Sequence, residues 1–413
     1  MKVFVIFFSF LFLFISGKIV DFIQIADVHY DKFMDCSLYD DTTNCRTNPF
    51  VTFSSTNRFY HKYKTNPMYN PMFGRYFCDS NKNLFLESVQ QAFRVSPHPK
   101  FIILSGDLPA HAPGEYFQDT MKEGVNIVQR RFPGVPIVFC LGNNEVEPAY
   151  ITSCDDKRYE KYFQFLNTTY IPLSEKESFV RHASYVRHLN HLQLTVVMIN
   201  TLLYSPRYKG EDCGSLEHIR EGINHARALG NSVLVVGHFP IGVSAFDCRS
   251  YMEKSIQDRL FNILQANEDI IIGNIFGHCH RDEIKVVNGV TAMTSISVSP
   301  FLGNAPGIRV YSYDINKRKL YDYVDYFMYF VKSSLKEKGI WTAGFSFKQL
   351  YGVEDASPNS IKEALKHIKR DHLLYLNYSM FTNGLFDPDF KNTLCRITSN
   401  NIEEGLKCQQ SLL

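Results

Sequence analysis

Five short apolar runs, each followed by a polar cluster, constrain the fold of this chain more than any other feature of its sequence. The runs are rich in aliphatic and β-branched residues, and a glycine or an aspartate follows each of them. A continuous apolar run of this length, bounded by turn residues, is typical of a strand buried on both faces. The runs are KIVDFIQIA (18–26), KFIILS (100–105), VPIVFCL (135–141), NSVLVV (231–236) and DIIIGNIF (269–276).

Segments with helical periodicity lie between these runs. Apolar residues recur at three- and four-residue spacing in 83–96, 115–132 and 215–230, and Gly230 is a candidate C-cap of the last segment. Strands that alternate with helices predict a layered α/β fold, in which ligands bind beyond the carboxyl ends of the strands. All five polar clusters lie at such ends, so we expect them to form one site.

The polar clusters supply seven side chains of the kinds that bind divalent metals. Carboxylate and imidazole groups suit Zn²⁺, iron or Mn²⁺. Taken singly, each has a structural explanation, because a strand-end aspartate is usually a turn residue or a helix cap. Together they suffice for two metals, which at about 3.5–4 Å separation activate water and clamp a phosphoryl group during displacement. The seven are Asp27, His29, Asp107, Asn143, His238, His278 and His280.

Charge and hydropathy limit the partners and the compartment. The chain has 44 Lys and Arg against 42 Asp and Glu, so we expect no nucleic-acid partner. Its first residues, MKVFVIFFSFLFLFISG, combine a lysine, an apolar run and small residues, which predicts a signal peptide over 1–17. The alternative is a membrane anchor, but the run is shorter than the ~20 residues of a membrane span. We therefore expect no transmembrane anchor.

Ten cysteines behind a predicted signal peptide indicate disulfides. Cys140 lies inside an apolar run and is expected to be a buried thiol. Two glycosylation sequons, at Asn167 and Asn377, agree with the secretory pathway. The expected pairs are Cys45–Cys78, Cys213–Cys248, Cys395–Cys408 and Cys36–Cys154.

The order of the clusters, D-x-H, G-D, G-N-x-E, G-H and G-H-x-H, resembles the calcineurin-like metallophosphoesterase superfamily. More narrowly, the chain is similar to the acid sphingomyelinase-like phosphodiesterases, with a resemblance that covers residues 20–408. It resembles the shorter relatives that carry no N-terminal saposin domain. Four further stretches carry the likeness: GDLPAHAP (106–113), INTLLY (199–204), NAPGIRVYSYD (304–314) and YGVEDASPNS (351–360).

The resemblance implies a four-layer α/β/β/α sandwich over 18–330, and the helical pattern beyond it predicts a C-terminal helical subdomain over 331–413. It also implies two metals, with a bridging hydroxide as nucleophile. The family's metal is usually Zn²⁺, which the nitrogen-rich ligand set suits, although iron and Mn²⁺ suit it too. One metal is assigned to Asp27, His29, Asp107 and His280, and the second to Asp107, Asn143, His238 and His278.

The stretch LGNNE (141–145) departs from the family pattern, in which a histidine stands at position 144. Asparagine donates a hydrogen bond but transfers no proton at neutral pH. An alkoxide, whose conjugate acid has a pKa near that of water, ~15.7, needs a proton to leave. A phosphate leaving group, with a pKa of about 6, does not. Asn144 therefore predicts a preference for phosphoanhydrides, such as nucleoside polyphosphates, over sphingomyelin.

Four neighbouring residues have predicted roles with alternatives. His111 is either a substitute acid or a group that orients the substrate or a metal ligand. Glu145 either holds Asn144 by a hydrogen bond or is a helix-entry acid. Asn200 and Tyr204 either line the cleft or belong to the core and a turn.

The expected function is a secreted, metal-dependent phosphoric diester hydrolase acting on a small phosphorylated substrate: a nucleotide, a polyphosphate or a phospholipid head group. A second reading is an endopolyphosphatase, because that branch of the superfamily has G-N-N-D at the same place. A third is a catalytically silent metal-binding surface protein, which Asn144 alone favours. The expected compartment is the secretory pathway, either outside the cell or in an acidic, lysosome-like organelle.

Overall fold

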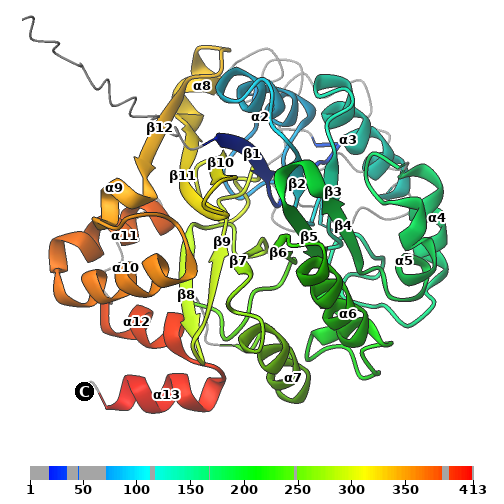
Figure 1. Cartoon of the computed structure of the whole chain (residues 1–413). Helices are drawn as coiled ribbons and strands as arrows, with labels where there is room; N and C mark the ends of the chain where they lie inside the picture. The colour runs from blue at the N-terminus through cyan, green and yellow to red at the C-terminus, as the bar shows by residue number, and fades with distance from the viewer. Residues whose placement is uncertain are drawn as a thin grey trace, which may run out of the picture.

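The computed structural model describes residues 18–34, 45, 71–111, 117–166, 168–245, 249–383 and 390–411. Two six-stranded sheets and their flanking helices make up this part of the chain (Figure 1). The predicted signal peptide (1–17), Cys36, Asn167 and Cys248 lie outside the described residues.

The first sheet has the strand order β12-β11-β10-β1-β2-β3. Strands β1, β2 and β3 run parallel, and the other pairs are antiparallel. The carboxyl ends of the three parallel strands therefore meet at one edge. The bounds are β1 Ile19–Ile25, β2 Ile102–Leu104, β3 Ile137–Phe139, β10 Gly307–Asp314, β11 Lys319–Met328 and β12 Trp341–Ser346.

The second sheet has the order β4-β5-β6-β7-β9-β8. Its central strands β5, β6, β7 and β9 are parallel, whereas β4 and β8 pair antiparallel at the edges. The bounds are β4 Tyr185–Leu189, β5 Leu194–Met198, β6 Ser232–Val236, β7 Ile271–Phe276, β8 Glu283–Val287 and β9 Val290–Thr294.

Helices cover the outer faces of both sheets (Figure 1). Helix α2 (Lys82–Val95) packs on the first sheet, and α6 (Ser215–Ala228) packs on β4, β5 and β6 of the second. Helices α10 (Pro358–Arg370) and α12 (Phe390–Thr398) pack on the edge strand β8. The other helices are α3 Phe117–Arg131, α4 Lys157–Phe165, α5 Lys176–His182, α7 Lys254–Gln265, α8 Phe330–Leu335, α9 Phe347–Tyr351, α11 His372–Asn383 and α13 Ile402–Gln410.

Strand β6 shows why its sequence is apolar throughout. Leu234 and Val236 belong to the core cluster between the sheets, whereas Val233 and Val235 belong to a second cluster beneath the helices. Alternate side chains of one strand thus enter two cores, since successive residues point to opposite faces. The predicted four-layer α/β/β/α architecture is confirmed.

A buried glutamine joins the two sheets next to the loops that carry the polar clusters. Gln24, near the end of β1, is fully buried, and its Nε2 donates to the Phe276 carbonyl at the end of β7 (2.9 Å) and to Ser105 Oγ (3.0 Å). Its Oε1 accepts from the Tyr311 hydroxyl (3.1 Å). Because every polar atom of this side chain has a partner, its burial is favourable and fixes the ends of β1 and β7 side by side.

The five predicted strands correspond to β1, β2, β3, β6 and β7, and the three predicted helices to α2, α3 and α6. Helices α10 to α13 confirm a helical C-terminal region. Strand β12 was not predicted: it lies beyond residue 330 and extends the first sheet by pairing with β11. No helix within the described residues combines the length and apolar character needed to cross a bilayer.

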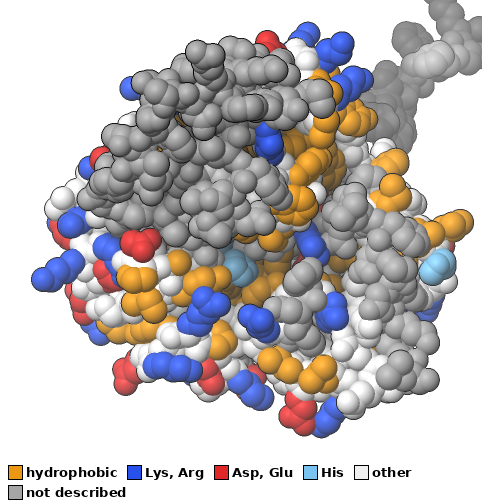
Figure 2. Space-filling model, turned by 180° about the vertical axis from the view of Figure 1, so that it is seen from behind, with side chains coloured by type: hydrophobic (Ala, Val, Ile, Leu, Met, Phe, Trp, Pro, Cys, Tyr) orange, Lys and Arg blue, Asp and Glu red, His pale blue; other side chains and the backbone are white. Residues whose placement is uncertain are grey.

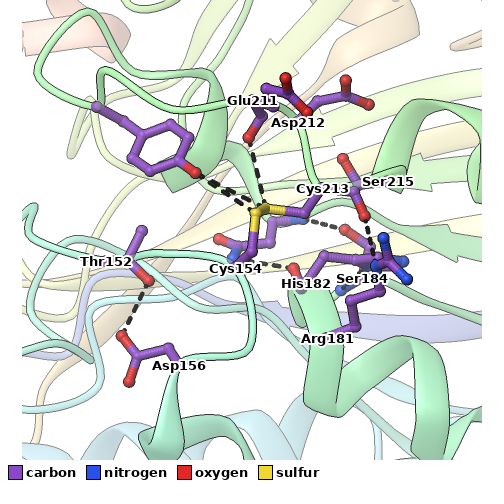
Figure 3. Close-up of a disulfide and its surroundings, with 12 residues drawn as sticks. Thr152, Cys154, Asp156, Arg181, His182, Ser184, Glu211, Asp212, Cys213 and Ser215 are labelled. Atoms are coloured by element: carbon purple, nitrogen blue, oxygen red, sulfur yellow. Dashed lines mark hydrogen bonds between the residues drawn. A yellow bond between two sulfur atoms is a disulfide. The ribbon is translucent and has the colours of Figure 1, made fainter.

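Three disulfides lie in the described part of the chain. Cys45–Cys78 and Cys395–Cys408 pair as predicted, and Cys140 is a buried free thiol. The third bond joins Cys154 to Cys213, 59 residues apart (Figure 3). It replaces both predicted pairs, Cys213–Cys248 and Cys36–Cys154, because the fold brings the loop before α4 against the loop before α6.

Candidate active site

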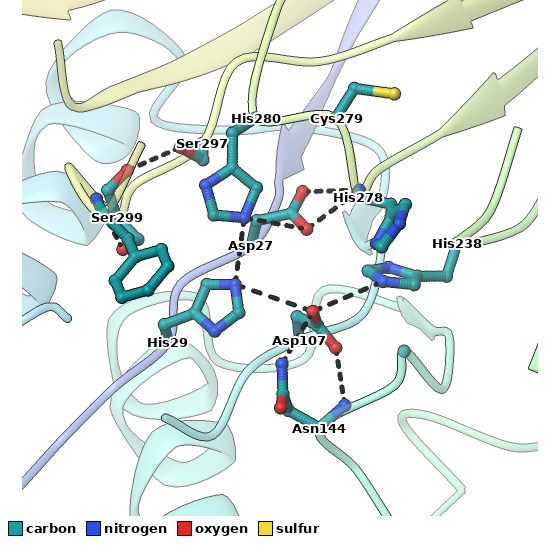
Figure 4. A network of polar contacts seen from close by, with 12 residues as sticks. Asp27, His29, Asp107, Asn144, His238, His278, Cys279, His280, Ser297 and Ser299 are labelled. Atoms are coloured by element: carbon teal, nitrogen blue, oxygen red, sulfur yellow. Dashed lines mark hydrogen bonds and ion pairs between the residues drawn. The ribbon is translucent and has the colours of Figure 1, made fainter. Parts of the chain in front are cut away.

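The predicted ligands come together at the carboxyl ends of the parallel strands of both sheets (Figure 4). His278 is partly exposed, and the other six are buried. The strand-end position is what unites them: Asp27 and His29 follow β1, Asp107 follows β2, Asn143 follows β3, His238 follows β6, and His278 and His280 follow β7.

One cluster of possible ligands consists of Asp27, His29 and His280. His29 Nε2 lies 3.0 Å from His280 Nε2, and His280 Nε2 lies 3.7 Å from Asp27 Oδ1. The Asp27 carboxylate is held in place by the backbone N–H of His278, at 2.8 Å from Oδ1 and 3.0 Å from Oδ2. Two imidazole nitrogens and a carboxylate oxygen therefore face one small volume.

A second cluster consists of Asp107, His238 and His278. Asp107 Oδ2 lies 3.4 Å from His238 Nε2, and Asn143 Oδ1 lies 3.2 Å from the same nitrogen. Asp107 Oδ2 also lies 3.6 Å from His29 Nε2 of the first cluster. One carboxylate oxygen thus stands between the two clusters, as a bridging ligand would.

Five of these residues have a left-handed backbone conformation. Their φ angles are 47° at Asp27, 45° at His29, 54° at Asp107, 67° at His278 and 56° at His280. Non-glycine residues rarely adopt positive φ, and such strain collects at functional sites. The strand ends turn sharply here, and the turns point all five side chains inward.

Two glycines allow the loops to approach one another. A Cβ at Gly106, whose φ is +94°, would lie 2.6 Å from His238 Nδ1. A Cβ at Gly142 would lie 2.3 Å from Asp107 Oδ1. Gly106 and Gly142 therefore end their strands and also leave room for a neighbouring ligand.

Burial keeps three of the imidazoles neutral. It lowers the pKa of His29 and His278 well below the ordinary histidine value and lowers that of His280 to about 3. A neutral imidazole has a nitrogen lone pair, which is the form that binds metals. These three rings are thus in the ligand state without any loss of a proton.

In the absence of a cation, the pKa values of Asp27 and His238 are both raised. Burial raises the pKa of Asp27 to about 8. Burial disfavours the charged form of His238, but the Asp107 carboxylate outweighs this effect and raises the pKa of His238 to about 9. A divalent cation would take the place of that proton and stabilise both carboxylates as anions. The donors (carboxylates, imidazoles and the Asn143 amide oxygen) therefore fit divalent metals.

Asn144 is bound to Asp107. Its backbone N–H donates to Asp107 Oδ1 (2.8 Å), and its Nδ2 donates to Asp107 Oδ2 (2.9 Å). The residue that replaces the family's histidine thus orients the carboxylate between the two clusters.

Glu145 has neither of its predicted roles. Its carboxylate accepts from three backbone N–H groups: Asp107 (2.8 Å), Leu108 (2.7 Å) and Gly142 (2.6 Å). It therefore ties the loop after β2 to the loop after β3, and does not hold the Asn144 side chain or begin a helix. The sequence alone does not indicate this role, because two of the three partners, the N–H groups of Asp107 and Leu108, belong to another loop.

We expect Glu145→Ala to lower the free energy of unfolding by about 3 kcal/mol or more, because each buried donor left without a partner costs ~1–3 kcal/mol. Urea unfolding at a fixed metal concentration measures this change. The exposed neighbour provides a matched control, since Glu147→Ala should change stability by less than about 0.5 kcal/mol. Equal unfolding midpoints for the two variants would contradict the bracing role of Glu145.

His111 lies beside the first cluster. Its ring stacks on His29, with centroids 4.1 Å apart and planes 2° apart, and its other face stacks on Phe301 at 4.1 Å. Asp79 holds it from behind, accepting from the His111 backbone N–H (2.9 Å) and bonding to Nδ1 (2.7 Å). The role of Asp79 is not apparent from the sequence, because an acid just before Asn81, the N-cap of α2, is an ordinary residue there.

His29, Asp79 and His111 are also close enough to hold a metal. The stacking argues against that use, however. A ring nitrogen binds a metal in the plane of its ring, and parallel stacked rings direct their lone pairs along separate planes. The arrangement suits a carboxylate–imidazole pair that handles protons.

The structure places Asn200 and Tyr204 in the core. Both are fully buried. Asn200 accepts from Leu202 N–H at the start of a 3-10 turn and donates to Tyr159, and the Tyr204 hydroxyl pairs with Ser215 Oγ at 2.9 Å. Of their two predicted readings, the core and turn reading is therefore correct.

An aromatic wall on the side of the second cluster was not predicted. The Phe239 ring lies 4.5 Å from the His278 ring, and Tyr150 stacks on Phe239 at 5.8 Å. The Arg207 guanidinium lies 3.9 Å from the Tyr150 ring centre. Nothing in the sequence joins Tyr150, Phe239 and Arg207, which come from three separate loops.

Comparison with known proteins finds relatives that cover most of this chain. Sphingomyelinase phosphodiesterase D of Dictyostelium discoideum is 27% identical, over 94% of this chain and 93% of that protein. Cyclic GMP-AMP phosphodiesterase SMPDL3A of Homo sapiens is 25% identical, over 74% of each chain. Among solved structures, purple acid phosphatase PPD1 of yellow lupin is similar with a TM-score of 0.46, at 12% identity, over 80% of this chain and 54% of that one.

Two family models match almost the whole described chain. Residues 20–282 match the calcineurin-like phosphoesterase family, and residues 283–385 match the C-terminal region of acid sphingomyelin phosphodiesterase. This family's fold implies divalent metals, and the two clusters are candidate groups for holding them. The chain therefore belongs to the calcineurin-like phosphoesterases, and within them to the acid sphingomyelinase-like phosphodiesterases, which are phosphoric diester hydrolases.

Proposed function

We propose that this protein is a secretory-pathway phosphodiesterase with two zinc ions, that it hydrolyses diesters whose leaving group is an alcohol, and that His111 is its general acid. The observation that carries the proposal is the placement of His111, stacked on His29 and held by Asp79. It supplies a proton donor in a site where Asn144 supplies none.

Seven residues would hold the two metals. Asp27, His29 and His280 would bind one, His238, His278 and Asn143 the other, and Asp107 both. The ions would neutralise charge on the phosphoryl group and lower the pKa of water toward neutrality. Asn144 and Glu145 are not among these seven, but both position Asp107. Asn144 orients the Asp107 side chain, and Glu145 fixes the Asp107 backbone.

Proton transfer would follow from the pairing of His111 with Asp79. A carboxylate can only accept, so Nδ1 of His111 donates to Asp79, and Nε2 is the nitrogen that gains and loses the catalytic proton. As water adds to phosphorus it loses a proton to solvent, the bond from phosphorus to the leaving oxygen breaks, and the electron pair of that bond stays on the leaving oxygen. The oxygen takes the proton from Nε2, and the neutral imidazole regains one from solvent.

Nucleoside polyphosphates are the second candidate substrate class. Asn144 favours them, since a phosphate leaving group needs no acid. The printed name of the human relative, a cyclic GMP-AMP phosphodiesterase, also points to nucleotides. The partly exposed Tyr150 ring, with Arg207 beside it, would suit a base and a phosphate.

A leaving-group comparison separates the two candidates. Wild type and Asn144→His, both loaded with Zn²⁺, would be assayed on sphingomyelin in detergent micelles, bis(p-nitrophenyl) phosphate and ATP, at acidic and neutral pH. We expect the wild type to cleave sphingomyelin, and Asn144→His to change that rate by less than about tenfold, because His111 already supplies the acid.

Two other results would change the assignment. If the wild type cleaves only ATP and the activated ester, and Asn144→His restores sphingomyelin cleavage, the nucleotide candidate is correct. If no substrate is cleaved while two metals are bound, the protein is catalytically silent.

Three disulfides support a place in the secretory pathway, because such bonds persist in oxidising compartments. The signal peptide over 1–17 and the division into a catalytic domain (18–330) and a helical subdomain (331–413) belong to the same proposal. N-terminal sequencing of the protein exported from a eukaryotic host would show whether cleavage occurs near Gly17.

A further inference from the structure

Exposed apolar side chains lie on the side of the candidate site where His111 stands. Phe301 stacks on His111 at 4.1 Å, and the next residue, Leu302, is 48% exposed. Phe77 lies against the same loop, because its backbone N–H donates to the Pro300 carbonyl (3.1 Å), and it is 58% exposed. The surface beside the proton donor is thus apolar and open to solvent.

This apolar surface continues onto helix α8. Tyr76, next to Phe77 in the chain, packs edge-on against Phe330 at the start of α8, with ring centroids 5.0 Å apart. Around Phe330, three further apolar side chains are more than half exposed: Tyr329, Val331 and Leu335. Figure 2 shows hydrophobic side chains beside lysine and arginine side chains at the margin of the molecule where α8 lies.

The same helix and the turn after it are basic. Lys332, Lys336 and Lys338 are exposed, and Glu337 is the one acidic residue between 329 and 341. Apolar side chains interleaved with exposed lysines on one short segment are typical of a surface that lies on an anionic membrane, where the apolar groups enter the head-group layer and the lysines meet lipid phosphates.

We propose that Tyr329, Val331 and Leu335, with Lys332, Lys336 and Lys338, form a docking surface for an anionic phospholipid bilayer. The apolar rim of Phe77, Phe301 and Leu302 connects this surface to the active site. The inference rests on the proposed function in one respect: the diester that it brings to the site is a membrane lipid.

The position of the rim agrees with the chemistry of such a lipid. In sphingomyelin the alcohol that leaves carries the two hydrocarbon chains, and His111 would protonate the oxygen of that alcohol. The side chain that contacts the other face of His111, Phe301, belongs to the apolar rim. The apolar part of the leaving group would therefore lie toward the bilayer, and the polar head toward the aromatic wall of Tyr150.

Vesicle co-sedimentation of the full chain tests the proposal. The vesicles would be phosphatidylcholine alone, or phosphatidylcholine with 30% phosphatidylserine. The variants are a charge triple, Lys332→Gln with Lys336→Gln and Lys338→Gln, and an apolar double, Val331→Ser with Leu335→Ser. The matched control is Leu173→Ser with Leu373→Ser, at positions 69% and 71% exposed elsewhere on the surface.

We expect the wild type and the control to bind the anionic vesicles, and salt to weaken this binding. The charge triple should lose about 100-fold in affinity, as three surface lysines contribute on anionic lipid. The apolar double should lose about tenfold or more. Both variants should keep wild-type activity on soluble bis(p-nitrophenyl) phosphate and lose activity on vesicle sphingomyelin.

The two proposals fail in different ways. Wild-type vesicle binding by both variants, or no binding by the wild type, would overturn the docking surface whatever the activity. Vesicle binding that follows the predicted order, with no hydrolysis of the soluble diester by any form, would overturn the proposed function and leave the docking surface standing.

Discussion

Asp107→Asn is expected to reduce kcat/KM by at least about 10³-fold and to lower the metal content of the protein from the proposed two ions per chain to one or none. The Asp107 carboxylate stands between both ligand clusters, 3.4 Å from His238 Nε2 and 3.6 Å from His29 Nε2. Removing its charge would weaken both metal sites, and metal ions contribute several kcal/mol of transition-state stabilisation, at about 1.4 kcal/mol per tenfold in rate.

The readout that separates metal binding from folding is elemental analysis by mass spectrometry, together with the shift in melting temperature on adding EDTA. Wild type should melt at a lower temperature after chelation, and Asp107→Asn should show a smaller shift. Asp31→Asn is the matched control, because Asp31 is also buried and lies outside both ligand clusters. If Asp107→Asn keeps two metals and activity within tenfold of wild type, the bridging assignment is wrong.

His111→Gln should lose activity in proportion to how poor the leaving group is. Loss of a positioned acid typically costs 10²–10⁴-fold, and we expect this range for sphingomyelin, whose leaving group is an alkoxide. For bis(p-nitrophenyl) phosphate, whose leaving group is a much weaker base, the loss should be under about tenfold. The metal content should stay at the wild-type value, because His111 is not among the seven residues proposed to hold the metals.

Asp79→Asn tests whether His111 works as one half of a pair. It should lower the rate on sphingomyelin by about 10–100-fold and change the rate on the activated ester little, since Asp79 acts by positioning His111. The double variant should be no worse than His111→Gln alone, as residues that act as a unit are non-additive. Equal losses on both substrates would identify Asp79 and His111 as structural supports.

The strands and the residues at their ends are predictable from the sequence, because both depend on local patterns. A buried parallel strand must be apolar along its whole length, and the residues that follow it reach a common edge whatever lies between. The five clusters could therefore be placed together before any contact was known. Strand β12 was missed because an edge strand such as WTAGFS, with both glycine and small residues, lacks a continuous apolar run.

The features that the sequence does not predict depend on contacts between residues far apart in the chain. Glu145 accepts hydrogen bonds from backbone N–H groups of another loop, so no side-chain motif predicts this role. Asp79 reaches His111 only because the segment before α2 folds back over the site. Cys154 pairs with Cys213 because two loops meet in space, whereas pairing by proximity in the sequence assigned both cysteines to other partners.

The left-handed backbone at Asp27, His29, Asp107, His278 and His280 has a consequence for how this protein can change. Each left-handed residue with a side chain costs roughly 1–2 kcal/mol relative to relaxed backbone, and glycine would remove that strain at any of the five. At Asp27 and Asp107, however, glycine would also leave the N–H groups of His278 and Asn144 without their acceptors, and a buried donor without a partner costs ~1–3 kcal/mol. The backbone strain and the hydrogen bonds that offset it thus lie at the same residues, and the strained turns persist because their side chains also fix the neighbouring loops.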